Sequence, residues 1–209
     1  LLVSSAASDV YKRQRMDNPD VTRLPIPTSW PQDGGPFMTL PLVVTSDPET
    51  GVHNLGMYRS QVFGPDEVGL HWQKHKHGAD HAEASEDRMP VAICLGGPPQ
   101  VIFSAISPLP DNLSEYEFAG LLSGRRLKIT KCLTNDLWVP ADCDFVIEGY
   151  TLPSERRMEG PFGDHFGHYS LEDEYPVMHV TAITHRKDPT VPMTICLLYT
   201  SDAADDTRS

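Results

Sequence analysis

The chain has 209 residues, with 29 acidic and 17 basic side chains and a formal net charge of -12, which argues against nucleic acid as a partner. No uninterrupted run of about 18 apolar residues occurs, so we expect no transmembrane segment. The central cysteines Cys94, Cys132 and Cys143 form no CxxC pair and are typical of reduced structural thiols in the cytoplasm.

Both ends of the chain have sequences that look foreign to it. Residues 4–14 (SSAASDVYKRQ) and 196–206 (CLLYTSDAADD) correspond to peptides encoded by the two strands of one transposon sequencing adapter. We therefore expect adapter-derived tails at 1–14 and 196–209, with a fragment of a longer gene product between them. Within that fragment, 15–36 is a lead-in rich in proline and glycine, and regular structure is expected from about Phe37.

Two hairpins are predicted in the first half of the fragment. Residues 37–46 are rich in strand formers, DPETG follows with turn chemistry, and 52–62 alternate between apolar and polar side chains. The apolar runs 91–95 and 100–106 are separated by GGPP, which cannot continue a strand and must turn. We therefore expect a second hairpin there.

One helix and more strands are predicted in the second half. Ser114 and Glu117 form a capping-box pattern, and apolar residues then recur at helical spacing until Gly124. Three later segments are rich in β-branched residues and are expected to be strands: 126–133, 144–152 and 177–186. These elements predict a mixed, β-rich domain, 37–195, built as a barrel-like antiparallel sheet with a few short helices.

Histidines are concentrated in two parts of the sequence. Seven of the nine fall within 52–81 or 164–168, and imidazole together with carboxylate and amide oxygens suits a divalent metal. The alternative is that four of them only line an exposed face of a helix or loop: His71, His75, His77 and His81. Composition alone leaves both interpretations open.

The segment EGPFGD (159–164) places a carboxylate on each side of a Gly-Pro-aromatic-Gly turn. Such a turn would bring Glu159 and Asp164 near one another beside an aromatic ring, and paired carboxylates can divide the roles of acid and base. The alternative is a surface turn with two solvated acids, which is the commoner place for Glu and Asp.

Six separated blocks carry a family resemblance: DPETGVHNLGMYRSQV, LHWQKHKHGA, MPVAICLGG, SPLPDNLSEYEFAGLLSG, KCLTNDLWVPADCDFVIEGY and EGPFGDHFGHYS. In residue types, order and spacing they resemble the UbiD family of prenylated-FMN-dependent decarboxylases and carboxylases, similar to 3-octaprenyl-4-hydroxybenzoate carboxy-lyase, across nearly all of 34–186. The resemblance implies an antiparallel split β-barrel of the FMN-binding type over 37–195.

The resemblance also implies sites for a cofactor and metals. Three residues would hold a divalent metal, usually manganese: Asn54, His71 and Glu115. Prenylated FMN would be lined by Asn54, Met57, Tyr58, Arg59, His71, Trp72, Gln73, Lys76 and His77. Ala105 and Ser107 would contribute to a potassium site.

By the same resemblance, Arg59, Glu159 and Asp164 form the catalytic network, with Asp164 as proton donor. The substrate would be an aromatic or α,β-unsaturated carboxylic acid that forms an adduct with prenylated FMN before CO2 leaves, and the reaction would be reversible. One candidate is 4-hydroxy-3-polyprenylbenzoate in ubiquinone synthesis, which would bring a cytoplasmic enzyme to the membrane surface.

Further expectations concern partners and alternatives. The resemblance implies a prenylated-FMN synthase as cofactor supplier and a homo-oligomeric parent enzyme, and the truncated chain alone is expected to be inactive. A metal-dependent hydrolase built on the histidine-rich segment and Asp164 is one alternative. A non-catalytic flavin-binding split-barrel protein is another, although it would not need Arg59, Glu159 and Asp164 together.

Overall fold

The computed structural model describes residues 2–3, 13–72, 87–110, 113–164 and 167–195. The helical elements in this part of the chain are η1 (Val21–Arg23, a 3-10 turn), α3 (Pro99–Ser104) and α4 (Glu115–Ser123). The strands are β1 (Leu2–Val3), β2 (Arg13–Arg15), β3 (Phe37–Met38), β4 (Leu42–Ser46), β5 (His53–Met57), β6 (Ser60–Val62), β7 (Glu67–Leu70), β8 (Met89–Leu95), β9 (Lys128–Lys131), β10 (Trp138–Pro140), β11 (Phe145–Glu159), β12 (Phe162–Gly163), β13 (Tyr169–Ser170) and β14 (Asp173–Arg186).

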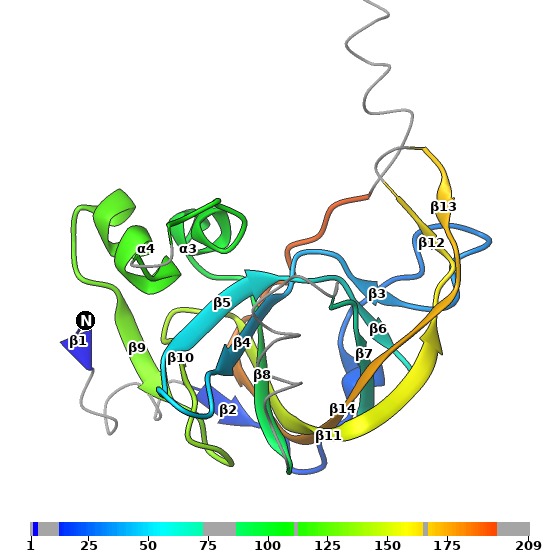
Figure 1. Cartoon of the computed structure of the whole chain (residues 1–209), viewed down its shortest axis with the longest axis horizontal. Coiled ribbons are helices and arrows are strands. Elements are labelled where there is room, and N and C mark those ends of the chain that lie inside the picture. Colours follow the sequence, from blue (N-terminus) through cyan, green and yellow to red (C-terminus); the bar gives the residue numbers. More distant parts are fainter. Residues whose placement is uncertain (1, 4–12, 73–86, 111–112, 165–166, 196–209) are drawn as a thin grey trace, which may run out of the picture.

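One antiparallel sheet forms most of the molecule. Its strands follow the order β3-β6-β7-β14-β11-β8-β4-β5, and β2 adds to β14. The sheet curls into a half-barrel, with α3 and α4 lying together outside it (Figure 1). The predicted β-rich, split-barrel-like fold with few helices is therefore confirmed.

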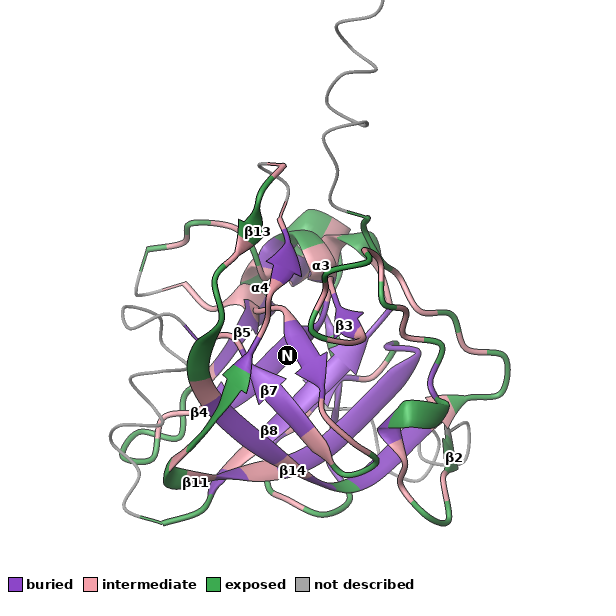
Figure 2. Ribbon diagram, turned by 90° about the vertical axis from the view of Figure 1, so that its right-hand side faces the viewer, coloured by how far each residue is buried: buried purple, intermediate pink, exposed green. Residues whose placement is uncertain are grey.

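The curled sheet is buried on both faces where β4 and β8 run side by side. Successive side chains of a strand point to opposite faces, so Val43 and Ile93 enter one core cluster while Leu42 and Val44 enter the other. Figure 2 shows these central strands buried along most of their length, whereas β13 is at an exposed edge. Continuous apolar runs are what a strand covered on both faces requires.

The second core cluster lies between the sheet and a smaller layer. Helices α3 and α4 contribute Val101, Tyr116 and Ala119 to it, and the small sheet β1-β9-β10 contributes Ile129 and Val139. The same cluster contains the three central cysteines as buried thiols. Their expected role as structural residues fits this position.

The helix predicted after Ser114 is confirmed in detail. The Ser114 hydroxyl accepts a hydrogen bond from the Tyr116 N–H at 3.1 Å, and the Glu117 carboxylate accepts one from the Ser114 N–H at 3.4 Å. Gly124 ends the helix in the left-handed region with φ 62°. The predicted hairpin around DPETG is also present as β4 and β5, because Asp47 accepts hydrogen bonds from two backbone N–H groups of the turn.

The expected strand at 100–106 is wrong, because this segment forms α3, and no second hairpin exists there. Proline at the first helical position has its φ already fixed for a helix and needs no N–H, so Pro99 starts α3. The run 37–46 is also divided into β3 and β4, with Pro41 in the break.

The lead-in 15–36 is largely irregular but packed against the sheet. The Asp20 carboxylate caps η1, and Val21 and Leu24 are buried in the first core cluster. At the ends of the chain, β1 pairs with β9 and β2 pairs with β14. Most of both expected adapter-derived tails lies outside the described residues, so that expectation stays a prediction.

Candidate functional site

The candidate site lies where several strands end at one side of the curled sheet. Arg59 sits between β5 and β6, His71 follows β7, and Glu159 is the last residue of β11. The His71 N–H donates to the Arg59 carbonyl oxygen at 3.2 Å, which extends the β6–β7 pairing by one step and sets the two side chains beside each other. Strand pairing therefore fixes where these groups stand.

Glu159 is the centre of this arrangement. Its side chain is fully buried, with 0% exposed, while Arg59 is 14% and His71 18% exposed. The Arg59 Nε donates to Oε1 at 3.0 Å and the His71 Nδ1 contacts Oε2 at 3.0 Å. Because a carboxylate can only accept, the His71 proton is on Nδ1 and Nε2 is the ring nitrogen that can bind a metal.

Two aromatic rings and a hydroxyl complete the surroundings of this ion pair. The Arg59 Nη2 donates to the Ser170 hydroxyl at 3.1 Å, and its guanidinium carbon lies 4.8 Å from the centre of the Phe162 ring. The His71 ring stacks on Tyr175 with centroids 4.2 Å apart. Burial is the largest cause that raises the pKa of Tyr175, and the charges of Glu159 and Asp173 raise it further. The positive charge of Arg59 partly opposes this shift.

Asp164 follows the turn that Glu159 begins. Residues Phe162–Gly163 (β12) pair with Tyr169–Ser170 (β13), and Asp164 is the first residue after β12. Its backbone N–H donates to the His168 carbonyl at 2.9 Å, which closes the tip of this small hairpin. Asp164 is partly buried, and its expected role as proton donor remains a prediction.

Two of the three expected metal ligands, Asn54 and Glu115, lie at neighbouring positions, whereas His71 is bound to Glu159. Glu115 is the first residue of α4, and its Oε2 accepts a hydrogen bond from the Leu55 N–H at 3.3 Å, directly after Asn54. The Asn54 side chain is buried, and its Nδ2 has no hydrogen-bond partner among the described residues. The described residues contain no group of three or more His, Cys, Asp and Glu side chains that could hold a metal ion, so the expected metal site stays a prediction.

The remaining expected cofactor residues lie around the same strand ends or outside the described residues. Met57 ends β5 and Tyr58 follows it, and both are partly buried. Trp72 is 4% exposed, and its Nε1 lacks a partner within the described part of the chain. Gln73, Lys76 and His77 lie outside the described residues, as do His75 and His81. Their assignments stay predictions.

The expected potassium ligands lie at the end of α3. Ala105 is the C-terminal cap of this helix, and the Ser107 hydroxyl donates to the Phe103 carbonyl at 2.8 Å. Their role as potassium ligands stays a prediction.

Four residues near the site were missed by sequence reasoning: Asp33, Gln61, Ser170 and Tyr175. Each is a common polar or aromatic residue whose role depends on partners far along the chain, such as the 111-residue separation of Arg59 and Ser170. The positions of Gln61 within the block DPETGVHNLGMYRSQV and of Ser170 within EGPFGDHFGHYS gave a signal that could have identified these two.

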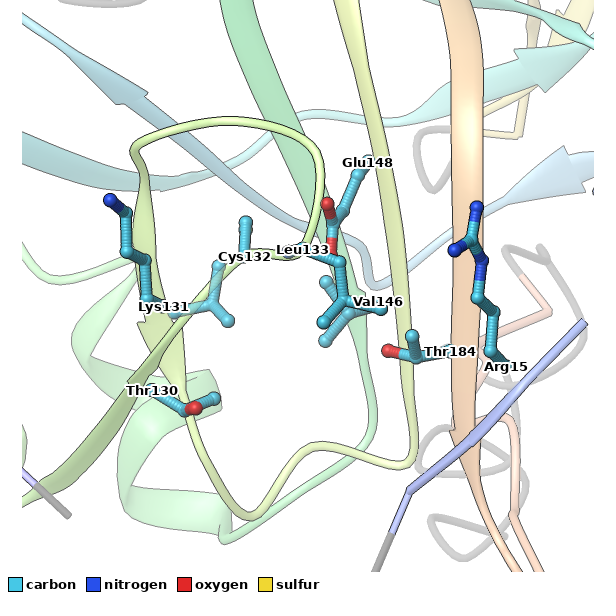
Figure 3. Close-up of a pocket in the computed structure, with 9 residues that line it drawn as sticks. Arg15, Thr130, Lys131, Cys132, Leu133, Val146, Glu148 and Thr184 are labelled. Carbon is cyan, nitrogen blue, oxygen red and sulfur yellow. The ribbon is translucent and has the colours of Figure 1, made fainter. Parts of the chain in front are cut away.

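A separate pocket opens between β9, β11 and β14 (Figure 3). Its cavity volume is about 240 Å³, and its lining is mostly apolar, with Thr130, Cys132 and Val146 among the residues that form it. Glu148 lies at its wall, but both carboxylate oxygens already accept hydrogen bonds from Leu133 and Thr134. None of the expected site residues lines this pocket.

Comparison with known proteins identifies the family. Residues 2–198 match the sequence model of the UbiD family, described as the 3-octaprenyl-4-hydroxybenzoate carboxy-lyase Rift-related domain. The chain belongs to the UbiD family. UbiD-class decarboxylases depend on prenylated FMN, and the membership confirms the resemblance seen in the six sequence blocks.

Solved UbiD-class structures superpose closely on the chain. The UbiD-class enzyme HmfF from Pelotomaculum thermopropionicum, in complex with FMN, is 34% identical with a TM-score of 0.87, covering 93% of this chain and 44% of that one. The vanillic acid decarboxylase of Sedimentibacter hydroxybenzoicus is 34% identical with a TM-score of 0.85, covering 90% and 42%. An FMN-binding domain of a flavin reductase-like enzyme from Shewanella baltica, at 13% identity and a TM-score of 0.50, shares the fold alone.

UbiD-family relatives are much longer than this chain. A protein of Archaeoglobus fulgidus is 48% identical over 177 residues, which are 83% of this chain and 37% of that protein. A protein of Chlamydia muridarum is 45% identical over 183 residues, which are 86% and 32%. The chain thus spans about a third of these relatives. Among the described residues, no helix is long and apolar enough to cross a membrane.

Proposed function

We propose that this chain is the cofactor-binding core of a prenylated-FMN-dependent decarboxylase that acts reversibly on aromatic or α,β-unsaturated carboxylic acids. The observation that carries the proposal is the fully buried Glu159, whose two carboxylate oxygens are bound separately by Arg59 and His71. Because the buried Glu159 carboxylate is held by two partners, the Arg59 guanidinium bound to it has little freedom to move. A cationic group is thereby fixed at the edge of the site. Similar structures named as complexes with FMN and prenylated FMN support the flavin, and those named as vanillic and 3,4-dihydroxybenzoic acid decarboxylases support the substrate class.

The residues present fit a flavin phosphate and a divalent metal. Asn54 and Trp72 each carry a buried side-chain nitrogen without a partner among the described residues, and leaving a buried donor unsatisfied costs roughly 1–3 kcal/mol. Phosphate oxygens would accept from such donors. We propose that manganese binds the Asn54 amide oxygen, the His71 Nε2 and the Glu115 carboxylate, because this mixed set suits a divalent ion.

Glu159 would serve this metal indirectly. A histidine that binds a metal commonly donates its other ring N–H to a carboxylate, which fixes the tautomer and the ring orientation. The 3.0 Å contact between the His71 Nδ1 and Glu159 is an arrangement of this kind. Glu159 thereby connects the proposed metal ligand to the proposed catalytic Arg59.

The chain's own residues would orient the substrate and move one proton. Bound prenylated FMN supplies the electron sink that lets the substrate lose CO2. Arg59 would attract and orient the substrate carboxylate, because its guanidinium is held in place by Glu159, Ser170 and the Phe162 ring. Asp164 would then give its proton to the carbon that carried the carboxylate, and would take it back in the carboxylation direction.

For the whole enzyme, we also propose a potassium ion near Ala105 and Ser107, a prenylated-FMN synthase that supplies the cofactor, and a cytoplasmic homo-oligomer. One substrate candidate remains 4-hydroxy-3-polyprenylbenzoate. A non-catalytic flavin-binding protein would have no need of the buried Arg59, His71 and Glu159 network, and this favours the enzyme.

The test is to produce the complete enzyme that contains this chain together with a prenylated-FMN synthase. We expect a flavin-like visible spectrum, bound manganese, and CO2 release from vanillic or 3,4-dihydroxybenzoic acid. Glu115→Gln should lose the metal, since the amide carries no charge to hold it. Glu117→Gln is the matched control, because glutamine preserves a capping box in the same turn of α4.

Two results would count against the proposal. A purified protein without flavin absorbance that carries zinc alone would favour a hydrolase. Equal loss of manganese in Glu115→Gln and Glu117→Gln would show that the metal does not depend on Glu115.

A further inference from the structure

We propose that residues 30–35 of the lead-in act as a clamp on the turn that carries Glu159 and Asp164, and that Asp33 is a positioning residue for Asp164. The catalytic consequence rests on the proposed function, whereas the clamp itself is a matter of structure. The clamp joins parts of the chain that are 130 residues apart.

Asp33 holds both sides of the clamp with one carboxylate. Its Oδ2 accepts a hydrogen bond from the Trp30 N–H at 2.9 Å, which closes a turn within the lead-in. Its Oδ1 accepts one from the Gly163 N–H at 2.8 Å, and Gly163 is the residue immediately before Asp164. Hydrogen bonds to an ionised acceptor are stronger than those between neutral groups, so this contact is a firm attachment.

The rest of the turn is held in the same way. The Gly160 N–H donates to the Gln61 side-chain oxygen at 2.8 Å, and the Gly34 N–H donates to the Pro161 carbonyl at 2.8 Å. The Phe162 N–H donates to the Ser170 hydroxyl at 3.2 Å. Backbone groups of four successive residues, 160–163, are thus each bound by a partner outside this turn.

Close packing leaves the clamp no room to shift. A Cβ added at Gly34 would overlap the Gly160 carbonyl, and one added at Gly163 would lie 2.6 Å from the Trp30 Cδ1. Glycine is therefore required on both sides of this contact. The turn at 160–163 therefore has little freedom to move toward or away from the lead-in.

Positioning matters here because a proton donor must reach its acceptor atom within hydrogen-bond distance. A misplacement of about 1 Å can lower a rate by roughly 100-fold. Asp164 extends from a strand of only two residues, β12, and such a short strand cannot define its own position. The clamp supplies the missing support, so the lead-in is part of the site.

The experiment compares Asp33→Ala with Asp20→Ala in the complete holoenzyme. Asp20 is a matched control, since it also accepts from a backbone N–H in the lead-in but contacts only η1. Amide hydrogen exchange should speed up at Gly163 and Asp164 in Asp33→Ala and stay unchanged in Asp20→Ala. This measurement needs no activity, and an unchanged exchange rate at both amides would overturn the clamp.

Kinetics test what the clamp does. Asp33→Ala should lower kcat by roughly 10- to 100-fold with little change in KM, and the solvent deuterium isotope effect on kcat should rise because proton delivery becomes slower. A merely structural role would reduce the amount of active enzyme without changing the isotope effect, and that outcome would overturn the positioning role. Absence of decarboxylation in the unsubstituted enzyme would instead overturn the proposed function, while hydrogen exchange still decides the clamp.

A second pair of variants guards against misfolding of Asp33→Ala. Gly34→Ala should also displace the turn, whereas Gly64→Ala should be tolerated, because an added Cβ at Gly64 meets nothing within 4 Å. Faster exchange at Gly163 in Gly34→Ala alone supports the clamp. The same exchange rate in both variants would count against it.

Discussion

Glu159 carries its charge in a position that water does not reach, so its stability depends on its two partners. Removing one member of a buried ion pair leaves the other charge uncompensated and costs roughly 3–5 kcal/mol. We predict that Glu159→Gln lowers the free energy of unfolding by about 3 kcal/mol, because Arg59 loses the charge that balances it and one of the two acceptor oxygens becomes an NH2 group that cannot accept. Urea unfolding of the metal-free chain measures this.

A surface ion pair provides the control for that measurement. Lys131 and Asp136 are 49% and 94% exposed and lie 2.7 Å apart. Asp136→Asn should leave the free energy of unfolding unchanged, since solvent already screens this pair. An equal loss in both variants would show that Glu159 is not specially important for stability.

A second prediction at the residue scale concerns His53 and pH. Its Nε2 accepts a hydrogen bond from the Trp138 N–H at 3.1 Å, so the ring must be neutral, and burial lowers its pKa below 6.5. The unfolded chain binds a proton near pH 6.5 while the folded chain does not. The stability from neutral His53 is therefore fully present above pH 6.5 and is lost as the pH falls through the lower, folded pKa.

This prediction is checked by thermal unfolding without added metal. His53→Gln keeps an acceptor for the Trp138 N–H but cannot titrate, so its melting temperature should fall less between pH 7 and pH 5 than that of the unsubstituted chain. His185→Gln is a suitable comparison, because His185 is only partly buried, its Nδ1 contacts the neighbouring Arg186 carbonyl, and its ring lies beside that of Phe145. Identical pH profiles for all three proteins would contradict the prediction.

Residue types predicted part of the site, but not how it is assembled. Arg59, Glu159 and Asp164 lie in blocks that the family resemblance singles out. The contact between His71 and Glu159 crosses 88 residues, and no local pattern encodes it. His71 was expected as a metal ligand, and the structure adds that its second nitrogen binds Glu159.

At the scale of single elements, α4 is where local sequence and structure agree. Replacing a capping serine by alanine typically lowers stability by about 1 kcal/mol. We predict that Ser114→Ala has this effect, because it leaves the Tyr116 N–H without its acceptor. It should also weaken manganese binding, since Glu115 lies in the same first turn.

A serine at the other end of the helix is the matched control. The Ser123 hydroxyl donates to the Ala119 carbonyl, a bond that helices do not need. Ser123→Ala should therefore leave both unfolding and metal affinity nearly unchanged, as measured by urea unfolding and manganese titration. A larger loss in Ser123→Ala than in Ser114→Ala would contradict the capping argument.

The opposite case is α3, where a run of apolar residues led to the prediction of a strand, although the segment is a helix. A short apolar run suits a buried strand and a buried helix equally well, because periodicity cannot separate them over six residues. The two prolines before Gln100 decide the outcome, since they set the backbone for a first helical turn. Long strands such as β11 and β14 were predicted correctly in place, although shorter than they are.

For the whole molecule, large apolar side chains are exposed on and next to both helices. The exposed side chains on or directly after them are Phe103, Ile106, Leu121 and Leu122, with Leu121 72% exposed. Exposed apolar groups that lie together favour association. We predict that the isolated chain self-associates through α3 and α4 at high concentration, which light scattering can measure.

Leu121→Gln should reduce this association while changing the free energy of unfolding by less than about 0.5 kcal/mol, since glutamine also favours helix and the site is exposed. Leu133→Gln is the control, because Leu133 is also exposed but lies in the turn before β10. Equal effects of both substitutions would contradict a role for the helices.

Strand order is the part of the fold that sequence could not predict. β11 lies between β8 and β14, and β4 pairs with both β5 and β8, so neighbours in the sheet are often distant in the chain. Alternating patterns identify strands and their buried faces but carry no information about which strand is adjacent. The strand pattern predicted a barrel-like antiparallel sheet and the family resemblance specified a split barrel, whereas the register of each strand pair came only with the structure.

The long ladder between β11 and β14 also has a kinetic consequence. Glu159 pairs with Asp173, so this ladder closes over a short connection, whereas β4 and β8 are joined by a much longer one. Short loops close faster because less chain entropy is lost, and we expect β11–β14 to form in the folding transition state. Val180→Ala should then slow folding, whereas Val44→Ala should mainly speed unfolding. Glu159 and the turn that leads to Asp164 would thus be formed before the rest of the barrel closes.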